Sequence, residues 1–404
     1  MDLKSGYPYW PAASGLIHVY PPLRADIQCE VAVVGGGVTG ALVAYRLIEA
    51  GISTVLVDKR DFGWGSTSAS TALIDYALDL PLADLAKRAG EDHAVQCYRA
   101  AWEAVEGIHG LVRDIGTPCG FERKDSLYLA SRRRDAKALK QEYECRVRHG
   151  FPLEYWDRQR IESHFPFSRP AALIHSDAAQ VDPYCLTHGL IERAVTRGLR
   201  AFDRTEVTGQ VVEGGGGKHR VRLATVDGPT ILAGTVVYAT GYETEEWLKQ
   251  RTVRLRNTYA LVSEPLEHLE GWYQQCLIWE TARPYLYLRL TEDGRAMIGG
   301  EDDAFASATK RDRSLNRKTG KLEDRFGRLF PAISLETAFA WAGTFAETDD
   351  GLPCIGTQPE YPGSWFALCY GGNGTTFAYL AAEIIRDGCL GRVNPSARLF
   401  RFDR

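Results

Sequence analysis

The chain has 404 residues, enough for two or three domains that each bury a sizeable core. Its formal net charge of −4 and its pI near 6.2 argue against a nucleic-acid partner, and no apolar run is long enough to span a bilayer. The N-terminal residues show no secretion-signal pattern, and the nine cysteines are scattered without a Cys-x-x-Cys pair. We therefore expect a cytoplasmic protein with reduced thiols and no metal site.

The first predicted element is a strand that leads into a glycine-rich turn. Val31–Val34 are apolar and run directly into Gly35–Gly40, which reads Gly-x-Gly-x-x-Gly. A helical pattern follows, and a second apolar run, 54–57, ends on Asp58. The strand, turn, helix and acid at these spacings predict a βαβ unit that binds a dinucleotide. An ordinary βαβ turn that binds nothing is the alternative.

Each part of this unit has a physical role in binding. Gly35 permits the tight turn, Gly37 lets the backbone approach a pyrophosphate, and Gly40 lets the helix pack on the strand. The helix N-terminus offers N–H groups to the phosphates. Asp58 can accept hydrogen bonds from a ribose, and its charge repels a 2′-phosphate, which argues against NADP.

The residues that follow the second strand, 61–72, are too small and too polar to form a core. It contains Gly65, Ser66 and Thr67, whose hydroxyls and N–H groups can surround phosphate and ribityl oxygens. A helix N-cap is the alternative, and Ser66 or Thr67 can serve both purposes. Residues 81–165 are predicted to be mostly helical, with one strand at 126–130.

A short strand from Ile174 comes next, followed by a helix that Val181–Pro183 open and that ends at Gly198. Three strands at about 202–213, 218–226 and 231–239 follow, joined by turn sequences. The glycine tract 214–217 favours a hairpin tip over a phosphate loop, because no helix follows it. The last strand ends in Ala239-Thr240-Gly241, whose small residues suit passage under a nucleotide.

Residues 257–300 are predicted to form alternating strands, and 308–330 a charged helix. Within the strands, period two puts Tyr285, Tyr287 and Arg289 on one face. Leu286 and Leu288 then face the core. Two hydroxyls and a guanidinium in register predict the ceiling of a substrate site, although a seam between domains could also use them.

The C-terminal segment contains a second glycine turn. Asp350-Gly351 precedes a strand at Trp365–Tyr370, which leads into Gly371–Gly374 and a helical pattern at 377–385. A glycine turn that feeds a helix N-terminus can stabilise negative charge. No second acid-tipped βαβ unit occurs, so we expect one dinucleotide with its reactive end under this turn.

Together these motifs resemble the FAD-dependent amine oxidoreductases of the D-amino-acid, glycine and sarcosine oxidase family, over nearly the whole chain. The resemblance rests on Gly35–Gly40 with Asp58, Gly65–Ser68, Val181–Pro183, Ala239–Gly241, Tyr285–Arg289 before Gly299-Gly300, and Asp350–Pro353 with Gly371–Gly374. It implies an α/β fold with two domains. A Rossmann-like FAD-binding domain would comprise 1–90, 171–247 and 338–404, and an antiparallel-sheet substrate domain would comprise 91–170 and 248–337.

The expected FAD-binding residues are Gly35, Gly37, Val38, Thr39, Gly40, Asp58, Lys59, Gly65, Ser66, Thr67, Val207, Ala239, Thr240, Gly241, Asp350, Gly351, Gly371, Gly372, Asn373, Gly374, Thr375 and Thr376. The chain also departs from the family. Gly343 stands where sarcosine oxidases tether FAD through a cysteine, which implies noncovalent FAD. Met297 and Thr376 stand where those enzymes carry lysines near the flavin. The absence of both lysines argues against rapid reaction with oxygen, and we expect oxygen or another carrier, such as a quinone, as the electron acceptor.

The resemblance implies that a neutral amine passes a hydride to flavin N5 and leaves an imine for hydrolysis. Tyr285, Tyr287, Arg289 and Arg283 are the candidate substrate residues, and either arginine could hold a carboxylate bidentately or form an ordinary ion pair. An FAD-dependent 2-hydroxy acid or glycerol-phosphate dehydrogenase is the alternative. A flavoprotein subunit with a structural or modifying role in a larger complex is the third possibility.

Overall fold

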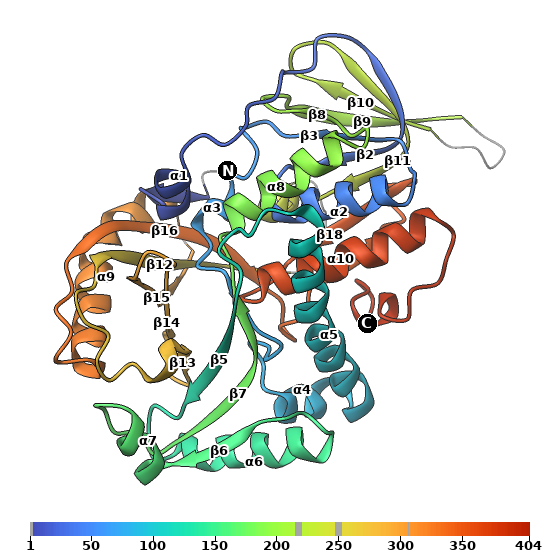
Figure 1. Ribbon diagram of the computed structural model, residues 1–404. Coiled ribbons are helices and arrows are strands. Elements are labelled where there is room, and N and C mark those ends of the chain that lie inside the picture. Colours follow the sequence, from blue (N-terminus) through green and yellow to red (C-terminus); the bar gives the residue numbers. More distant parts are fainter. Residues whose placement is uncertain (1–2, 215–219, 247–252, 306) are drawn as a thin grey trace.

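Two β-sheets and the helices packed on them make up the computed structural model, which describes residues 3–214, 220–246, 253–305 and 307–404 (Figure 1). The α-helices are α1 (Tyr9–Ser14), α2 (Val38–Glu49), α3 (Ser66–Ala69), α4 (Leu82–Ala89), α5 (Glu91–Ile115), α6 (Asp135–Arg148), α7 (Arg158–His164), α8 (Pro183–Val195), α9 (Ala308–Leu329) and α10 (Gly374–Cys389). Short 3-10 helices are η1 (Gly241–Glu246), η2 (Tyr273–Gln275) and η3 (Ala397–Leu399). Within the described residues, none of the helices combines the length and apolarity that crossing a membrane requires.

The first sheet has eight strands. Its main path runs β17 (Cys354–Thr357), β18 (Ser364–Leu368), β11 (Thr230–Tyr238), β2 (Ile27–Val34), β3 (Thr54–Val57) and β8 (Arg200–Phe202), and β10 (Arg220–Thr225) joins β11 to β9 (Val207–Glu213). The strands from β18 to β8 pair in parallel. The adjoining ends of β2 and β3 are fully buried, as expected for a parallel sheet covered on both faces.

Two separate cores cover the two faces of this sheet. Val31, Val33 and Leu56 pack with residues of α2, α5, α8 and α10 on one face. Ala32 and Val55 point the other way, into a core shared with the strands β9, β10 and β11. Figure 1 shows α2, α8 and α10 side by side along the first face. The alternation of side chains along the strands therefore builds a layered α/β unit.

The second sheet has ten strands and is mostly antiparallel. Its path runs β1 (Lys4–Gly6), β16 (Thr337–Glu347), β12 (Arg254–Pro265), β15 (Arg295–Ala304), β14 (Leu286–Leu290), β13 (Leu277–Glu280), β5 (Glu122–Leu129), β7 (Ala171–Gln180) and β4 (Leu73–Ile74), with β6 (Glu154–Asp157) paired to β7. Helix α9 covers one face, where Leu322 and Phe326 pack in one core with Leu286 and Leu288 (Figure 1). Each such buried side chain contributes about 1.5–3 kcal/mol.

The expected α/β fold is confirmed, including the strand–turn–helix–strand unit of β2, α2 and β3. Strands and helices also occupy the expected parts of 257–300 and 308–330. The single strand expected at 202–213 is divided into β8 and β9, and 81–165 contains β6 in addition to the one expected strand, β5. The expected hairpin tip at 214–217 lies mostly outside the described residues, as does the expected domain boundary at 247. The division into domains stays a prediction.

Four strands lie in the other sheet from the one that the expected division implies. Strands β1, β4, β7 and β16 fall within segments assigned to the FAD-binding domain, yet all four belong to the ten-stranded sheet. The two longest are placed by pairing with a distant strand, β7 with β5 and β16 with β12. Such pairing depends on tertiary contacts, which a local sequence pattern does not reveal.

Candidate active site

One cavity is lined by residues from both sheets. The eight-stranded sheet contributes the carboxyl ends of β2, β3, β11 and β18 with the turns that follow them. The ten-stranded sheet contributes residues of β12, β14, β15 and β16 from the opposite side. A cavity at the carboxyl ends of parallel strands is the usual place for a ligand in an open α/β sheet.

The first glycine turn leaves no room for side chains at Gly35, Gly36 and Gly40. A Cβ on Gly40 would lie 1.7 Å from the carbonyl oxygen of Gly35, so α2 sits directly on the turn. Gly35 itself has a φ of +107°, and a Cβ there would lie 2.4 Å from the carbonyl oxygen of Ala239. Gly37 lines the cavity and begins α2 without a side-chain cap. The N-terminus of α2 is therefore close-packed from behind and open toward the cavity.

Asp58 lies at the end of β3 in the cavity wall. Its carboxylate accepts hydrogen bonds from the backbone N–H of Gly36 at 2.6 Å and of Arg60 at 2.8 Å. Burial raises the pKa of Asp58, while these two hydrogen bonds favour its charged form. Asp58 thus ties the glycine turn to β3 and places a carboxylate where a ribose hydroxyl could reach it.

A salt bridge that the sequence did not reveal lies beside Asp58. Glu243 accepts from Lys59 at 3.0 Å and from Arg60 at 2.9 Å, and all three residues line the cavity. Burial opposes ionisation of Glu243, but the hydrogen bonds from Arg60 and Lys59 lower its pKa to about 2. No local motif pairs residue 243 with residues 59 and 60, so this cluster appears only in the folded chain.

The Gly65–Thr67 segment forms the start of the short helix α3 and faces the turn. The Thr67 hydroxyl accepts a hydrogen bond from the N–H of Val38 at 3.0 Å. Ser66 Oγ is buried and lacks a hydrogen-bond partner among the described residues. A buried hydroxyl without a partner is costly unless a ligand satisfies it.

The C-terminal glycine turn is held by the segment that precedes α4. Gly372 N–H donates to Asp79 Oδ2 at 2.6 Å, and the Asn373 side chain donates to the carbonyl of Ala77 at 3.0 Å. Because the Asn373 side chain is used in this way, α10 begins without a side-chain cap. Gly374 and Thr375 line the cavity, so the uncapped N-terminus of α10 faces it.

Most of the expected cofactor residues line this one cavity. The exceptions are Gly40, which packs behind the turn, and Asp350, Gly351 and Thr376. Asp350 instead pairs with Arg404 at 2.7 Å, and the Thr376 hydroxyl donates to the carbonyl of Asp75 at 3.2 Å. Asp350 and Thr376 therefore support neighbouring segments of the chain rather than the cavity wall, and their assignment to the cofactor stays a prediction.

On the opposite wall, Tyr285 and Tyr287 line the cavity as expected for the ceiling strand. The Tyr287 hydroxyl lies 3.1 Å from Thr258 Oγ1, and burial raises its pKa. Gly299 pairs with Tyr287 across the sheet, and a Cβ on Gly299 would lie 2.1 Å from the tyrosine ring. Gly299 therefore makes space for the ring in the sheet, which the sequence analysis did not recognise.

The two candidate arginines lie outside the cavity lining. Arg289 is 2% exposed, and its Nη1 donates to the carbonyls of Thr71 at 2.9 Å, Ala72 at 3.0 Å and Val181 at 2.9 Å. Burial lowers the pKa of Arg289 to about 9. Its guanidinium joins three chain segments and faces their carbonyls instead of the cavity, and its expected role as an anchor for a substrate carboxylate stays a prediction.

Arg283 is exposed and stacks on the ring of Tyr285. It therefore lies next to the ceiling without lining the cavity.

Carboxylates that the sequence analysis missed lie beside the two tyrosines. Asp79, Asp302 and Glu347 line this part of the wall, together with Phe345. Glu347 pairs with Arg256 at 3.0 Å. Among the described residues that line the cavity, the basic side chains are those of Lys59 and Arg60, which lie at the Asp58 end. The ceiling is therefore acidic and aromatic.

The residues present fit FAD. An open helix N-terminus at the first glycine turn suits a pyrophosphate, Asp58 suits the ribose, and the unpartnered Ser66 hydroxyl offers a further hydrogen bond. The uncapped N-terminus of α10 would lie toward the reactive end and suits a negative charge there.

Comparisons with known proteins agree with this geometry. The family model described as FAD dependent oxidoreductase matches residues 30–387. The chain is 25% identical to glycine oxidase of Bacillus subtilis strain 168 over 385 residues, covering 93% of this chain and 97% of that protein. It is 24% identical to gamma-glutamylputrescine oxidoreductase of Escherichia coli strain K12 over 387 residues, covering 94% and 88%.

A solved structure shows the same fold. Glycine oxidase from Geobacillus kaustophilus superposes with a TM-score of 0.77 at 20% identity, covering 94% of this chain and 100% of that chain. Since the family model spans most of the chain and the cavity fits the cofactor, the chain belongs to the DAO family of FAD-dependent oxidoreductases.

Proposed function

We propose that this protein oxidises the carbon–nitrogen bond of an amine or an amino acid, with FAD as the hydride acceptor. The observation that carries the proposal is the acidic, aromatic ceiling over the cavity. An amine enters as an ammonium ion at neutral pH, and Asp79 and Asp302 attract a cation. A 2-hydroxy acid or a glycerol phosphate is an anion, and the same carboxylates repel it. The alternative from the sequence is therefore disfavoured.

The protein contributes binding, orientation and electrostatics to this reaction. Bound FAD supplies the redox chemistry by accepting a hydride. The Tyr285 and Tyr287 rings close the cavity from the side of the ten-stranded sheet and limit the approach of water. The open N-terminus of α10 stabilises negative charge that develops at the opposite end.

We further propose that FAD is held noncovalently and that a carrier other than oxygen receives the electrons. Gly343 lines the cavity where the sequence resemblance implies a cysteine in the tethered relatives. Cys369 is a lining cysteine, and it is the residue to examine if FAD proves to be attached. Among the described residues, Lys59 is the lining lysine, and it lies at the Asp58 end. Met297, which stands where the sarcosine oxidases carry a lysine, is buried in a core with Trp341.

No disulfide joins any of the nine cysteines, all of which lie in the described residues, and such thiols are typical of a reducing compartment, which supports a cytoplasmic location.

An anaerobic screen tests the proposed reaction. The yellow protein is mixed with amines, amino acids, 2-hydroxy acids and glycerol phosphate, and the flavin absorbance is followed. We expect bleaching by at least one amine and none by the anions without an amino group. Bleaching by the hydroxy acids or glycerol phosphate alone would transfer the assignment to the carbon–oxygen alternative. A purified chain that contains FAD but is reduced by none of them would favour a role as a subunit.

A further inference from the structure

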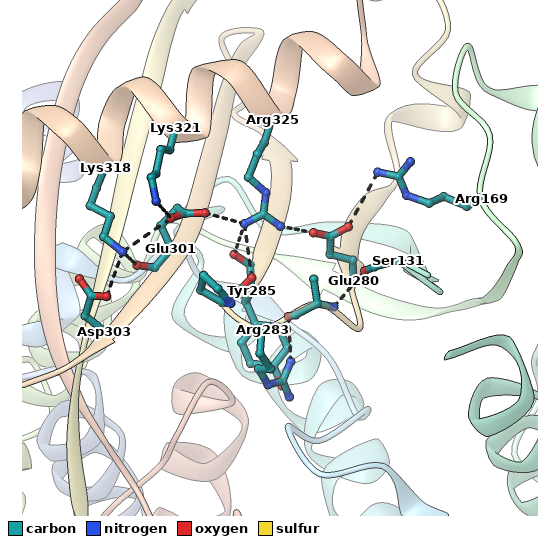
Figure 2. A network of polar contacts seen from close by, with 12 residues as sticks. Ser131, Arg169, Glu280, Arg283, Tyr285, Glu301, Asp303, Lys318, Lys321 and Arg325 are labelled. Carbon is teal, nitrogen blue, oxygen red and sulfur yellow. Dashed lines mark hydrogen bonds and ion pairs between the residues drawn. The ribbon is translucent and has the colours of Figure 1, made fainter. Parts of the chain in front are cut away.

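Asp302 differs from the acids on either side of it in what it contacts. Glu301 and Asp303 both point toward helix α9, where Asp303 pairs with Lys318 at 3.0 Å and Glu301 pairs with Arg325 at 3.0 Å (Figure 2). Lys321 also lies 3.4 Å from Glu301. The flanking carboxylates are therefore neutralised by the basic face of α9.

Asp302 instead lines the cavity. Its Oδ1 atom is buried and has no hydrogen-bond partner among the described residues.

A β-bulge explains the different direction of Asp302. Gly300 pairs with Tyr259 and Asp303 pairs with Asn257, so two residues of β15, Glu301 and Asp302, lie opposite one residue of β12. Bulges of this kind re-aim a side chain and are frequent beside active sites. The ion pairs of the bulged residue Glu301 with Lys321 and Arg325 of α9 hold the bulge from outside, and Asp302 is thereby directed into the cavity.

Helix α9 holds the neighbouring ceiling segment as well. Arg325 Nη1 donates to the carbonyl of Tyr285 at 3.0 Å and its Nη2 contacts Glu280, so one guanidinium joins β13, the residue before β14, and β15 (Figure 2). The Glu301 N–H donates to the same Tyr285 carbonyl at 3.1 Å. The position of Asp302 relative to the tyrosine ceiling is therefore fixed by several contacts.

The charged groups that face Asp302 come from three other elements. Asp79 and Glu347 repel its charge, whereas Arg283 and the Thr258 hydroxyl favour it. Glu347 is balanced by Arg256, and Asp79 accepts from the backbone of Gly372. Burial together with the two neighbouring acids raises the pKa of Asp302 to about 6.

We propose that Asp302 binds the ammonium group of the substrate and accepts its proton before the carbon–nitrogen bond is oxidised. The inference rests on the proposed function and names a residue and a substrate charge for it. In this step one N–H bond of the ammonium breaks and one O–H bond forms on Asp302. A carboxylate–ammonium pair becomes a carboxylic acid and a neutral amine. The nitrogen lone pair released in this way assists departure of the hydride.

The decisive variant is Asp302→Asn, which keeps the shape of the side chain and removes its charge. An amine with a pKa near 10.4 is neutral to the extent of about one part in a thousand at pH 7.4. Without the charge and the proton acceptor of Asp302, the variant can use only this neutral fraction of the substrate. The rate of flavin reduction per substrate concentration should therefore fall by about 10²–10³-fold at that pH. The rate should rise about tenfold per pH unit in the variant and approach the parent rate when the amine in solution is neutral.

Two further variants separate this role from a structural one. Asp303→Asn removes a neighbouring charge that faces α9 instead of the cavity, and it should keep the parent pH profile. Asp302→Glu restores a carboxylate and should regain much of the rate at neutral pH. FAD occupancy, measured from the visible absorbance of each purified variant, shows whether the protein is folded.

Tetramethylammonium chloride provides a test that needs no turnover. The cation has no N–H proton, so its binding reports charge recognition alone. Binding is measured by the change in flavin absorbance on titration, and sodium chloride at equal ionic strength is the control. We expect at least tenfold weaker binding to Asp302→Asn than to the parent and to Asp303→Asn. Equal binding to all three, or an unchanged pH profile in Asp302→Asn, would overturn the proposal. If no amine reduces the parent flavin, the proposed function fails, while this titration still decides whether Asp302 binds a cation.

Discussion

Gly374→Ala tests whether FAD lies against the C-terminal glycine turn, because the added methyl group would clash with no atom of the protein itself. A Cβ built on Gly374 has no protein atom within 4 Å, although this residue lines the cavity. Gly374 is the first residue of α10, where alanine is a better helix former. The apo protein should therefore keep its stability or gain up to about 1 kcal/mol.

Binding of FAD should change in the opposite direction. An added methyl group in a filled site costs about 1–3 kcal/mol, which corresponds to about 5- to 150-fold weaker binding. The free energy of unfolding is measured by denaturation of the apo protein, and the dissociation constant by quenching of flavin fluorescence on titration.

Gly110→Ala is the matched control, since Gly110 lies in α5 and a Cβ there also meets no atom within 4 Å. The control should gain similar stability and bind FAD as the parent does. An unchanged dissociation constant in Gly374→Ala would show that the flavin does not contact this turn.

Three further predictions concern the cofactor and the buried arginine. Asp58→Ala should weaken FAD binding by about ten- to a hundredfold, because a charge-assisted hydrogen bond to the ribose is lost, and equal affinity in the titration would remove Asp58 from the ribose site. Acid precipitation of the purified protein should release the flavin into the supernatant, whereas a yellow pellet would point to attachment and direct attention to Cys369. Arg289→Met should lower the free energy of unfolding by about 2–4 kcal/mol, since three carbonyls lose their shared donor. Its KM should change equally for an amino acid and for the decarboxylated amine, and a rise confined to the amino acid would restore Arg289 as a carboxylate anchor.

The cofactor half could be predicted from sequence because its signals are local. A strand, a glycine turn, a helix and an acid follow one another within Val31–Asp58, and the spacing of each part reflects direct neighbours. The same holds for the helix predicted at Val181–Pro183, where the Asp182 carboxylate accepts from Tyr184 and Cys185 N–H at 2.8 and 2.9 Å. Capping depends on residues only two or three positions apart.

The ceiling could be predicted only in part, because its contacts are distant in sequence. Period two correctly separated Tyr285 and Tyr287 from the leucines of the core, but it could not show that Arg289 meets carbonyls from residues 71, 72 and 181. The same alternation fails at the bulge near Asp302, since an extra residue shifts the faces of the strand. The run Glu301-Asp302-Asp303 beside the basic pattern of 308–330 was the available signal.

The product of one anaerobic turnover tests the central claim most directly. FAD-loaded protein is mixed with the amine that bleaches it. The molar amounts of reduced flavin, carbonyl product and released nitrogen compound are then measured. The account predicts one molecule of ammonia or amine and one carbonyl for each flavin reduced. Flavin reduction that yields a carbonyl from a hydroxyl group, with no nitrogen compound released, would contradict it.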